Sequence, residues 1–211
     1  MSADLTLAGD WATQSNNYLV KIKSKNILMN FEGSIKYKNF GTIKKAGPII
    51  TNSCFPNFKN SILNLANNHF MDLGYKNASY NIENLERRNF KFIGFGKNLK
   101  ESRKELILKI NKKKIALIGC CEPQFGVSKI NKGGVAEVGP WVTTKILELK
   151  KKCDYIIVSI HGGLETSPWP APETRDLYRS WINVGASIIH GHHSHIPQVW
   201  QKYKNGYIFS R

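Results

Sequence analysis

Closely spaced histidines near the end of the chain are the residues best suited to chemistry. The sequence GHHSH at 191–195 follows the apolar run ASII at 186–189. An extended backbone at this junction would turn His193 and His195 to the same side, beyond the end of a strand. Neutral imidazole is a ligand for zinc, iron, manganese or nickel. The spacing therefore predicts a transition-metal site, and a surface loop with incidental histidines is the alternative.

Four more polar clusters each begin where an apolar, strand-like run stops. Because ligands bind beyond the carboxyl ends of strands in sheets flanked by helices, clusters in this common position predict one shared site. Five of the six histidines lie in these clusters or in the C-terminal one. Taken singly, Asp10 is also explained as a turn residue or helix cap, and residues 67–69 as an Asx turn. The candidate side chains are Asp10, Glu32, Asn67, Asn68, His69, Asp72 and His161.

Between these clusters, apolar residues alternate between helical and strand-like spacing. Strands are predicted at 90–94, 105–110 and 115–119, between helices that each present one apolar stripe to a sheet. The 211 residues, of which 41% are hydrophobic, suffice for one domain with a sizeable core. The helical stripes are Ala78, Ile82 and Leu85; Val142, Ile146 and Leu149; and Leu177, Trp181 and Val184.

Five sequence blocks carry a family resemblance. In order, LAGDW, NFEGSI, LNLANNHFMDLG, SIHGGLE and GASIIHGHHSHIPQ resemble the CapA family of poly-gamma-glutamate capsule biosynthesis proteins, a branch of the calcineurin-like metallophosphoesterases. The resemblance implies an α/β fold, a four-layer sandwich of two mixed β-sheets flanked by helices. We expect residues 1–211 to form a single domain of this kind. Residues 206–210 resemble the start of the family's closing strand, and relatives continue where this sequence stops at Arg211, so we expect either a minimal version of the domain or one shortened at its C-terminus.

The resemblance also implies a two-metal centre at the edge of the sheets. Its ions would be manganese, iron or zinc. The implied ligands are Asp10 and His195 for the first ion, Asn68, His161 and His193 for the second, and Glu32 as a bridge between them. His69 would be an acid beside the metals and not a ligand. Because Trp11 and Ala12 follow Asp10, where many relatives of the superfamily have Asp-x-His, we expect the first site to bind its ion weakly or to be empty.

Such a centre suits phosphoryl transfer. Two ions can share a water, lower its pKa and hold it in line with a phosphoryl group. The leaving oxygen needs a proton, which His69 could donate. Asp72 could orient that imidazole, with helix capping as the alternative. Glu165, Trp169 and His192 are expected to contact substrate, and Trp169 could either stack on a sugar or nucleobase or close the edge of the core.

The formal net charge of +16 favours anionic partners. Phosphoesters, acidic polysaccharides, polyglutamate and nucleic acid all qualify, although AT-rich codon usage explains part of the lysine content, and no interleaved basic and aromatic module supports nucleic acid. No run approaches the ~18 apolar residues of a membrane helix and no signal-peptide region begins the chain, so we expect a cytoplasmic location. Cys54, Cys120, Cys121 and Cys153 lack the spacing of a zinc knuckle, and we assign them no function.

Three functions from different classes stay open. The favoured one is a metal-dependent hydrolase, a phosphoesterase of capsule or surface-polysaccharide biosynthesis. The second is a non-hydrolytic component of capsule or polyglutamate assembly that binds acidic polymer. The third is a metallonuclease that uses the positive surface to hold DNA or RNA.

Overall fold

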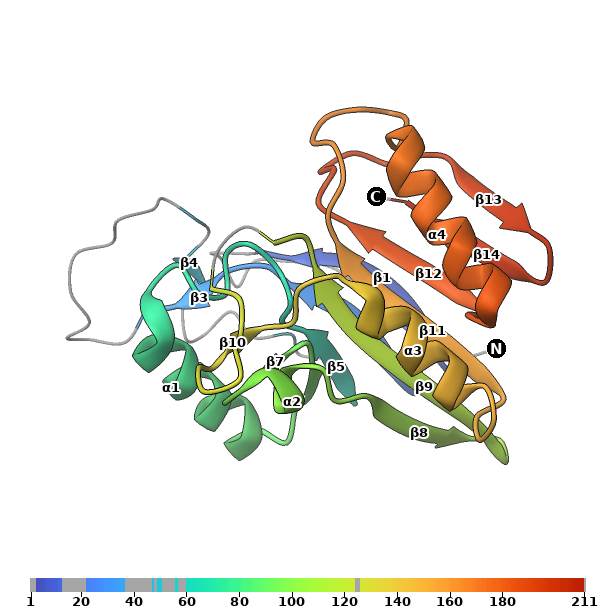
Figure 1. Ribbon diagram of the computed structural model, residues 1–211. Coiled ribbons are helices and arrows are strands. Elements are labelled where there is room, and N and C mark those ends of the chain that lie inside the picture. Colours follow the sequence, from blue (N-terminus) through green and yellow to red (C-terminus); the bar gives the residue numbers. More distant parts are fainter. Residues whose placement is uncertain are drawn as a thin grey trace.

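Two β-sheets stacked face to face form the centre of the computed structural model (Figure 1). The structure describes residues 3–12, 22–36, 47, 49–50, 56, 60–123 and 126–210, so Cys54 lies outside the described residues. The four-stranded sheet has the order β1-β2-β5-β6, and all its pairs are parallel. Its strands are β1 (Thr6–Trp11), β2 (Ile27–Phe31), β5 (Ser61–Asn64) and β6 (Lys91–Ile93).

The six-stranded sheet is mixed and has the order β13-β14-β12-β11-β9-β8. Its four inner strands are parallel, and the two edge strands, β8 and β13, pair antiparallel. Its strands are β8 (Leu106–Ile110), β9 (Lys113–Cys121), β11 (Tyr155–His161), β12 (Ile188–His192), β13 (Trp200–Tyr203) and β14 (Gly206–Phe209). Two small sheets pair β3 (Ser34–Ile35) with β4 (Ile49–Ile50), and β7 (Phe95–Gly96) with β10 (Gly134–Val135).

Helices cover the two outer faces of the sheet pair. α1 (Gly74–Arg87) packs on the four-stranded sheet, while α3 (Pro140–Leu149) and α4 (Pro172–Val184) lie side by side on the six-stranded one (Figure 1). A short helix, α2 (Leu99–Ser102), follows β7. The predicted four-layer α/β sandwich is therefore confirmed, with the six-stranded sheet mixed and the described pairs of the four-stranded sheet parallel.

Side-chain alternation along the strands divides the apolar core into three clusters. On β11, Ile156 and Val158 face α3 and α4, whereas Ile157 faces the opposite sheet, where it packs with Leu28 and Ile62. This is the period-two alternation of a strand that is buried on both faces. The third cluster lies between the four-stranded sheet and α1, and it includes Met29.

The helical predictions are confirmed for the first two stripes and partly wrong for the third. In α4 the buried face carries Tyr178, Trp181 and Ile182, whereas Leu177 is 37% exposed. Leu177 and Tyr178 are both apolar enough to define a stripe, and packing against the six-stranded sheet selects Tyr178. The helix ends at Gly185, whose φ of 130° suits a residue without a side chain.

Candidate metal centre

The polar clusters at the strand ends meet at one edge of the sheet pair. Asp10 lies near the end of β1, Glu32 follows β2, and Asn68 follows β5. From the other sheet, His161 ends β11, and the loop after β12 carries His193 and His195. Parallel strands end at the same edge, which is why residues from distant parts of the sequence come together here.

Glycines let the chain turn away directly after two of these residues. Gly33 follows Glu32 with a φ of 141°, and Gly163 lies two residues after His161 with a φ of 115°. Residues other than glycine rarely adopt these backbone conformations. The turns leave the Glu32 and His161 side chains at the sheet edge instead of inside a continuing strand.

The residues expected around the second ion converge on His161. Its Nε2 atom lies 3.0 Å from Asn68 Oδ1, 3.1 Å from His193 Nδ1 and 3.7 Å from Glu32 Oε1. Its other ring nitrogen, Nδ1, lies 3.0 Å from Asn30 Nδ2. One oxygen from an amide, one from a carboxylate and two imidazoles therefore face a common point.

The residues expected around the first ion form an adjoining group. One potential ligand atom from each of Asp10, Glu32 and His195 lies within 4.8 Å of the other two. Glu32 Oε1 is 3.9 Å from His195 Nε2, so the same oxygen faces both groups of residues. This shared position is the one that a bridging ligand occupies.

The environment of Glu32 tests whether these residues fit a metal. Its side chain is 2% exposed, and neither carboxylate oxygen has a hydrogen-bond partner among the residues that the structure describes. Burial and the nearby charge of Asp10 raise the pKa of Glu32 to about 7. A buried carboxylate without donors is costly, and a divalent cation would remove that penalty. Carboxylate, amide and imidazole ligands suit manganese, iron or zinc, so the donor set fits such an ion.

The protonation states agree with a ligand role. Burial and the neighbouring His193 lower the pKa of His161 well below its usual value, and burial also lowers the pKa of His193. Burial opposes ionisation of Asp10, but the His192 imidazole 2.8 Å away and the hydrogen bond from Asn30 outweigh it and lower the pKa of Asp10. Neutral imidazoles and an ionised carboxylate are the forms that bind metals.

His69 and Asp72 form a close pair beside Glu32. His69 Nδ1 lies 2.7 Å from Asp72 Oδ2, and His69 Nε2 lies 4.0 Å from Glu32 Oε1. The N-cap residue of α1 is Leu73, without a side-chain cap bond, so Asp72 is directed at the imidazole. Asn67 Oδ1 accepts hydrogen bonds from the backbone N–H groups of His69 and Phe70, which fixes this turn.

The loop after β12 has a different backbone from the expected one. His193 and His195 have φ values of 102° and 58°, in the left-handed region, so the extended backbone predicted here is wrong. The tight turn is held by the Thr166 backbone N–H, which donates to Ser194 O at 2.8 Å. Strained backbone of this kind is found at ligand sites, where surrounding contacts enforce it.

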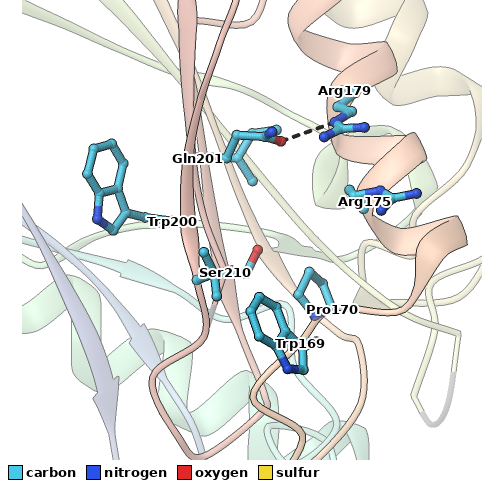
Figure 2. Close-up of a pocket in the computed structure, with 9 residues that line it drawn as sticks. Trp169, Pro170, Arg175, Arg179, Trp200, Gln201 and Ser210 are labelled. Atoms are coloured by element: carbon cyan, nitrogen blue, oxygen red, sulfur yellow. Dashed lines mark hydrogen bonds between the residues drawn. The ribbon is translucent and has the colours of Figure 1, made fainter.

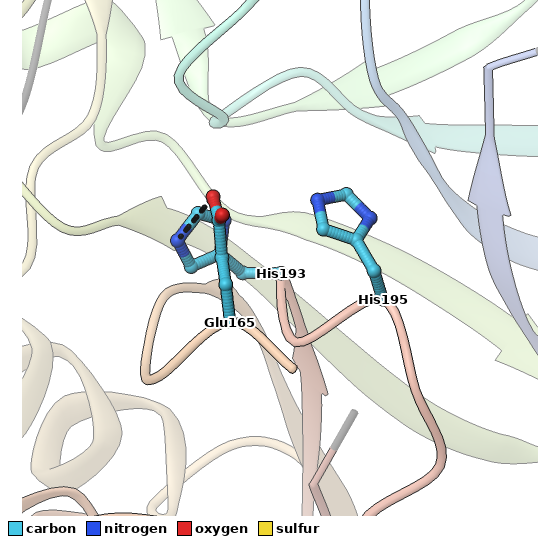
Figure 3. Close-up of side chains that lie close together, drawn as sticks. All are labelled: Glu165, His193 and His195. Atoms are coloured by element: carbon cyan, nitrogen blue, oxygen red, sulfur yellow. Dashed lines mark ion pairs between the residues drawn. The ribbon is translucent and has the colours of Figure 1, made fainter. Parts of the chain in front are cut away.

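Glu165 approaches the histidine loop from the segment after β11. Its Oε1 atom lies 3.5 Å from His193 Nε2, and the side chain is 57% exposed (Figure 3). Glu165, His193 and His195 also offer ligand atoms that lie within 4.8 Å of one another. Glu165 thus lies on the solvent side of the centre, where a substrate would approach.

His192 and Trp169 lie apart from the open side of the centre. His192 is fully buried, with Nδ1 2.8 Å from Asp10 Oδ1 and Nε2 3.3 Å from His190 Nδ1. This burial argues against the substrate contact expected from the sequence, because the imidazole faces the Asp10 carboxylate and not the open side of the centre. Trp169 is 65% exposed and lines a separate cavity, so it does not close the edge of the core.

Sequence reasoning assigned no role to three residues that support the centre. Asn30 links Asp10 to His161, and His190 lies behind His192. Asn30 stands directly after the apolar run 27–29 and two residues before Glu32, which is the sequence signal that could have identified it. The β1–β2 register then places it opposite Asp10. Gly47 packs against the His69–Asp72 pair, but it comes from a distant segment that carries no local motif.

The cysteines in the described part of the chain lie in or beside the apolar core. Cys120 and Cys121 are buried, and burial raises the pKa of Cys121 to about 12, so its thiol stays protonated. None of the helices in the described ranges combines the length and apolar character that crossing a bilayer requires.

The chain is similar to capsule synthesis proteins over most of its length. A family model described as "Bacterial capsule synthesis protein PGA_cap" matches residues 23–209. The PGA biosynthesis protein CapA of Bacillus subtilis (strain 168) is 30% identical over 190 residues, which cover 85% of this chain and 50% of that protein. The capsule biosynthesis protein CapA of Bacillus anthracis is 29% identical over 156 residues, 71% of this chain and 38% of that protein.

A more distant relative, a probable polyglutamine synthesis accessory protein of Mycobacterium tuberculosis, is 25% identical over 154 residues. These cover 66% of this chain and 40% of the relative. The chain thus spans half or less of the length of these curated relatives.

Proposed function

We propose a function from the premise that the chain belongs to the family of bacterial capsule synthesis proteins PGA_cap, as its five sequence blocks predicted. In this proposal it is a metal-dependent phosphoric ester hydrolase of capsule or surface-polysaccharide biosynthesis. The observation that carries it is the buried Glu32 carboxylate, which has no hydrogen-bond donor among the described residues and is shared by two groups of potential ligands.

Two divalent ions of manganese, iron or zinc are the cofactors in this proposal. Asp10 and His195 would hold the first, Asn68, His161 and His193 would hold the second, and Glu32 would touch both. When bound, the ions would lower the pKa of a water and neutralise charge on a phosphoryl group. The first site has fewer protein ligands and an exposed one, His195, so it should bind its ion more weakly.

His69 is the proposed general acid. Asp72 occupies Nδ1, which directs Nε2 toward the centre beside Glu32. In this position, Nε2 would donate its proton to the leaving oxygen, and Asp72 would stabilise the imidazolium before the transfer. His69 is not needed as a ligand, so its role is separable from metal binding.

The remaining site residues act on the substrate or on the ligands. Glu165 would accept a hydrogen bond from a substrate hydroxyl or orient His193, which it already contacts. His192 would orient the Asp10 carboxylate from behind, as outer partners of metal ligands commonly do. The net charge of +16 would attract the anionic substrate.

The test combines metal analysis with a substrate screen. The full chain is reconstituted with manganese, iron or zinc, and bound metal and phosphate release from mono- and diesters are measured. Glu32→Gln should lose both metal and hydrolysis. The control, Glu83→Gln, removes an exposed carboxylate on α1 that pairs with Arg87, and it should retain both. Full metal content in Glu32→Gln would contradict the proposal.

A second candidate is a non-hydrolytic component that binds an acidic polymer such as polyglutamate. The curated relatives carry names of capsule, PGA or polyglutamine synthesis, and a cavity lined by two arginines adjoins the loop of Glu165. In this case the metal-loaded protein would retain acidic polymer and release no phosphate from any ester of the panel.

A further inference from the structure

A cavity beside the metal centre combines positive charge with an exposed aromatic ring. It has a volume of about 450 Å³ and lies between α4, the β13–β14 hairpin and the loop that carries Trp169. That volume falls in the usual range of ligand sites. In Figure 2, Arg175 and Arg179 project from α4, Trp169 and Pro170 lie at one end, and Trp200 points to the other face of its strand.

The two arginines are one helical turn apart and are held differently. Arg179 Nε donates to Gln201 Oε1 at 3.1 Å, and its guanidinium lies 5.2 Å from the centre of the Tyr203 ring. Arg175 Nε lies 3.4 Å from Asp176 Oδ1 at an exposed position. Among the described residues, both recorded pairings use Nε, which leaves the terminal amino groups of each guanidinium for a ligand.

The backbone of Trp169, whose indole is exposed, is held in place by its own loop. Ser167 Oγ accepts from the Trp169 backbone N–H at 3.3 Å and donates to Trp169 O at 2.8 Å. Gln198 Nε2 donates to Ser167 O at 2.8 Å, which ties the loop to the segment before β13. A large apolar ring that a structured loop presents to solvent is typical of a binding surface.

The same loop joins this cavity to the metal centre. Glu165 contacts His193, and the Thr166 backbone N–H bonds to Ser194 O in the histidine loop. Trp169 follows only four residues after Glu165. A long ligand could therefore occupy the cavity while another part of it lies at the metal centre.

The side chains that line the cavity favour one class of polymer. Guanidinium groups bind carboxylates through paired hydrogen bonds, and Trp169, Pro170 and Ile208 provide apolar surface for methylene groups. An uncharged sugar chain would offer no anionic partner to the two guanidinium groups. Glutamyl units, with one carboxylate and a short methylene chain each, match both kinds of wall.

We propose that this cavity is a second subsite, which binds a glutamyl polymer through Arg175 and Arg179 with its methylene groups against Trp169. The inference rests on the second candidate function, the binding of an acidic polymer, because it names the polymer and its place of binding. A glutamyl polymer carries no phosphoric ester, so it is not offered as a substrate of the hydrolase. The inference does not depend on catalysis, since the metal ligands lie outside the cavity.

The test measures binding of fluorescently labelled poly-gamma-glutamate to the full chain in the presence of EDTA, at fixed salt. Arg175→Gln should weaken binding by about tenfold or more, the effect of losing one charge-assisted pair. Arg179→Lys keeps the charge but loses the planar guanidinium group that can bind a carboxylate through two hydrogen bonds. The affinity of this variant should therefore fall between those of wild type and Arg175→Gln. Arg87→Gln makes the same charge change at an exposed position of α1 and should bind like wild type.

Several outcomes would overturn the subsite. One is the absence of binding by the wild-type chain, and another is an equal loss in Arg87→Gln and Arg175→Gln, which would indicate general electrostatic attraction. A third is that polygalacturonate or DNA binds as tightly and responds in the same way to Arg175→Gln. Because metal is absent from the assay, a failure of phosphoester hydrolysis would leave the binding result intact, and a failure of binding would leave the hydrolase proposal intact.

Discussion

The metal centre and the arginine cavity lie next to each other but are built in opposite ways. The centre is buried at the ends of parallel strands, where Asp10, Glu32 and His161 are fixed by both sheets. The cavity uses an exposed helix face, a loop and edge strands, and its arginines are partly exposed. Under the two proposals, buried strand ends hold the metal ligands, whereas a more exposed surface recognises a long ligand.

The largest expected effect separates catalysis from metal binding within the buried region. His69→Ala should lower phosphoester hydrolysis by ~10²- to 10⁴-fold, the usual contribution of a general acid. The metal content should stay at the wild-type value, because His69 is proposed as an acid and not a ligand. Asp72→Asn should show a smaller loss of rate, since it keeps the imidazole but weakens its orientation.

The measurements are steady-state rates and bound metal on the same samples. Glu83→Gln on α1 is the control, because it removes a carboxylate from an exposed pair. Unchanged hydrolysis in His69→Ala would refute the acid assignment. Loss of metal in that variant would instead make His69 a ligand.

The convergence of the centre was predictable from sequence because it follows from topology. Polar residues at the ends of apolar runs predicted a common edge, and the structure places Asp10, Asn68 and His161 there. The detailed backbone was not predictable. The φ of 102° at His193 occurs in a loop that the Thr166–Ser194 hydrogen bond joins to a segment with no shared local pattern.

The cavity was not predictable for a related reason. Arg175 and Arg179 have the spacing of an ordinary solvated helix face, and their surroundings come from the β13–β14 hairpin. The rotation of α4 is likewise set by packing, which buries Tyr178 and exposes Leu177. Periodicity identifies the presence of a helix more securely than the face that it buries.

The next prediction concerns the residue behind Asp10. His192→Ala removes the imidazole that lies 2.8 Å from the Asp10 carboxylate, so manganese affinity should fall by ~10- to 100-fold, as for other outer partners of metal ligands. Affinity is measured by competition with a chelator. Ser159→Ala, which removes a buried hydroxyl near Asn64, is the control and should bind manganese normally. Normal affinity in folded His192→Ala would contradict the orienting role.

A smaller effect should follow from crowding the His69–Asp72 pair. A Cβ atom at Gly47 would clash with His69 Nδ1 and Asp72 Oδ2. Gly47→Ala should therefore lower the free energy of unfolding by about 1–3 kcal/mol, and slow hydrolysis by displacing the pair. Denaturant unfolding measures the first effect. At Gly139 the nearest atom to an added Cβ is Trp141 Cδ1 at 3.5 Å, so Gly139→Ala should be mild. Equal effects of the two substitutions would contradict a role of Gly47 in positioning the His69–Asp72 pair.

The smallest effect is expected in the arginine cavity, the more exposed of the two regions. Trp169 is 65% exposed, so Trp169→Ala should change the free energy of unfolding by less than about 0.5 kcal/mol and leave metal content unchanged. Trp181→Ala, in the buried face of α4, is the contrasting control and should destabilise the fold by about 3–5 kcal/mol. Denaturant unfolding and metal analysis distinguish the two variants. If Trp169→Ala lost metal, the loop from Glu165 to Pro170 would have to be counted as part of the buried centre, and the separation between the two regions would fail.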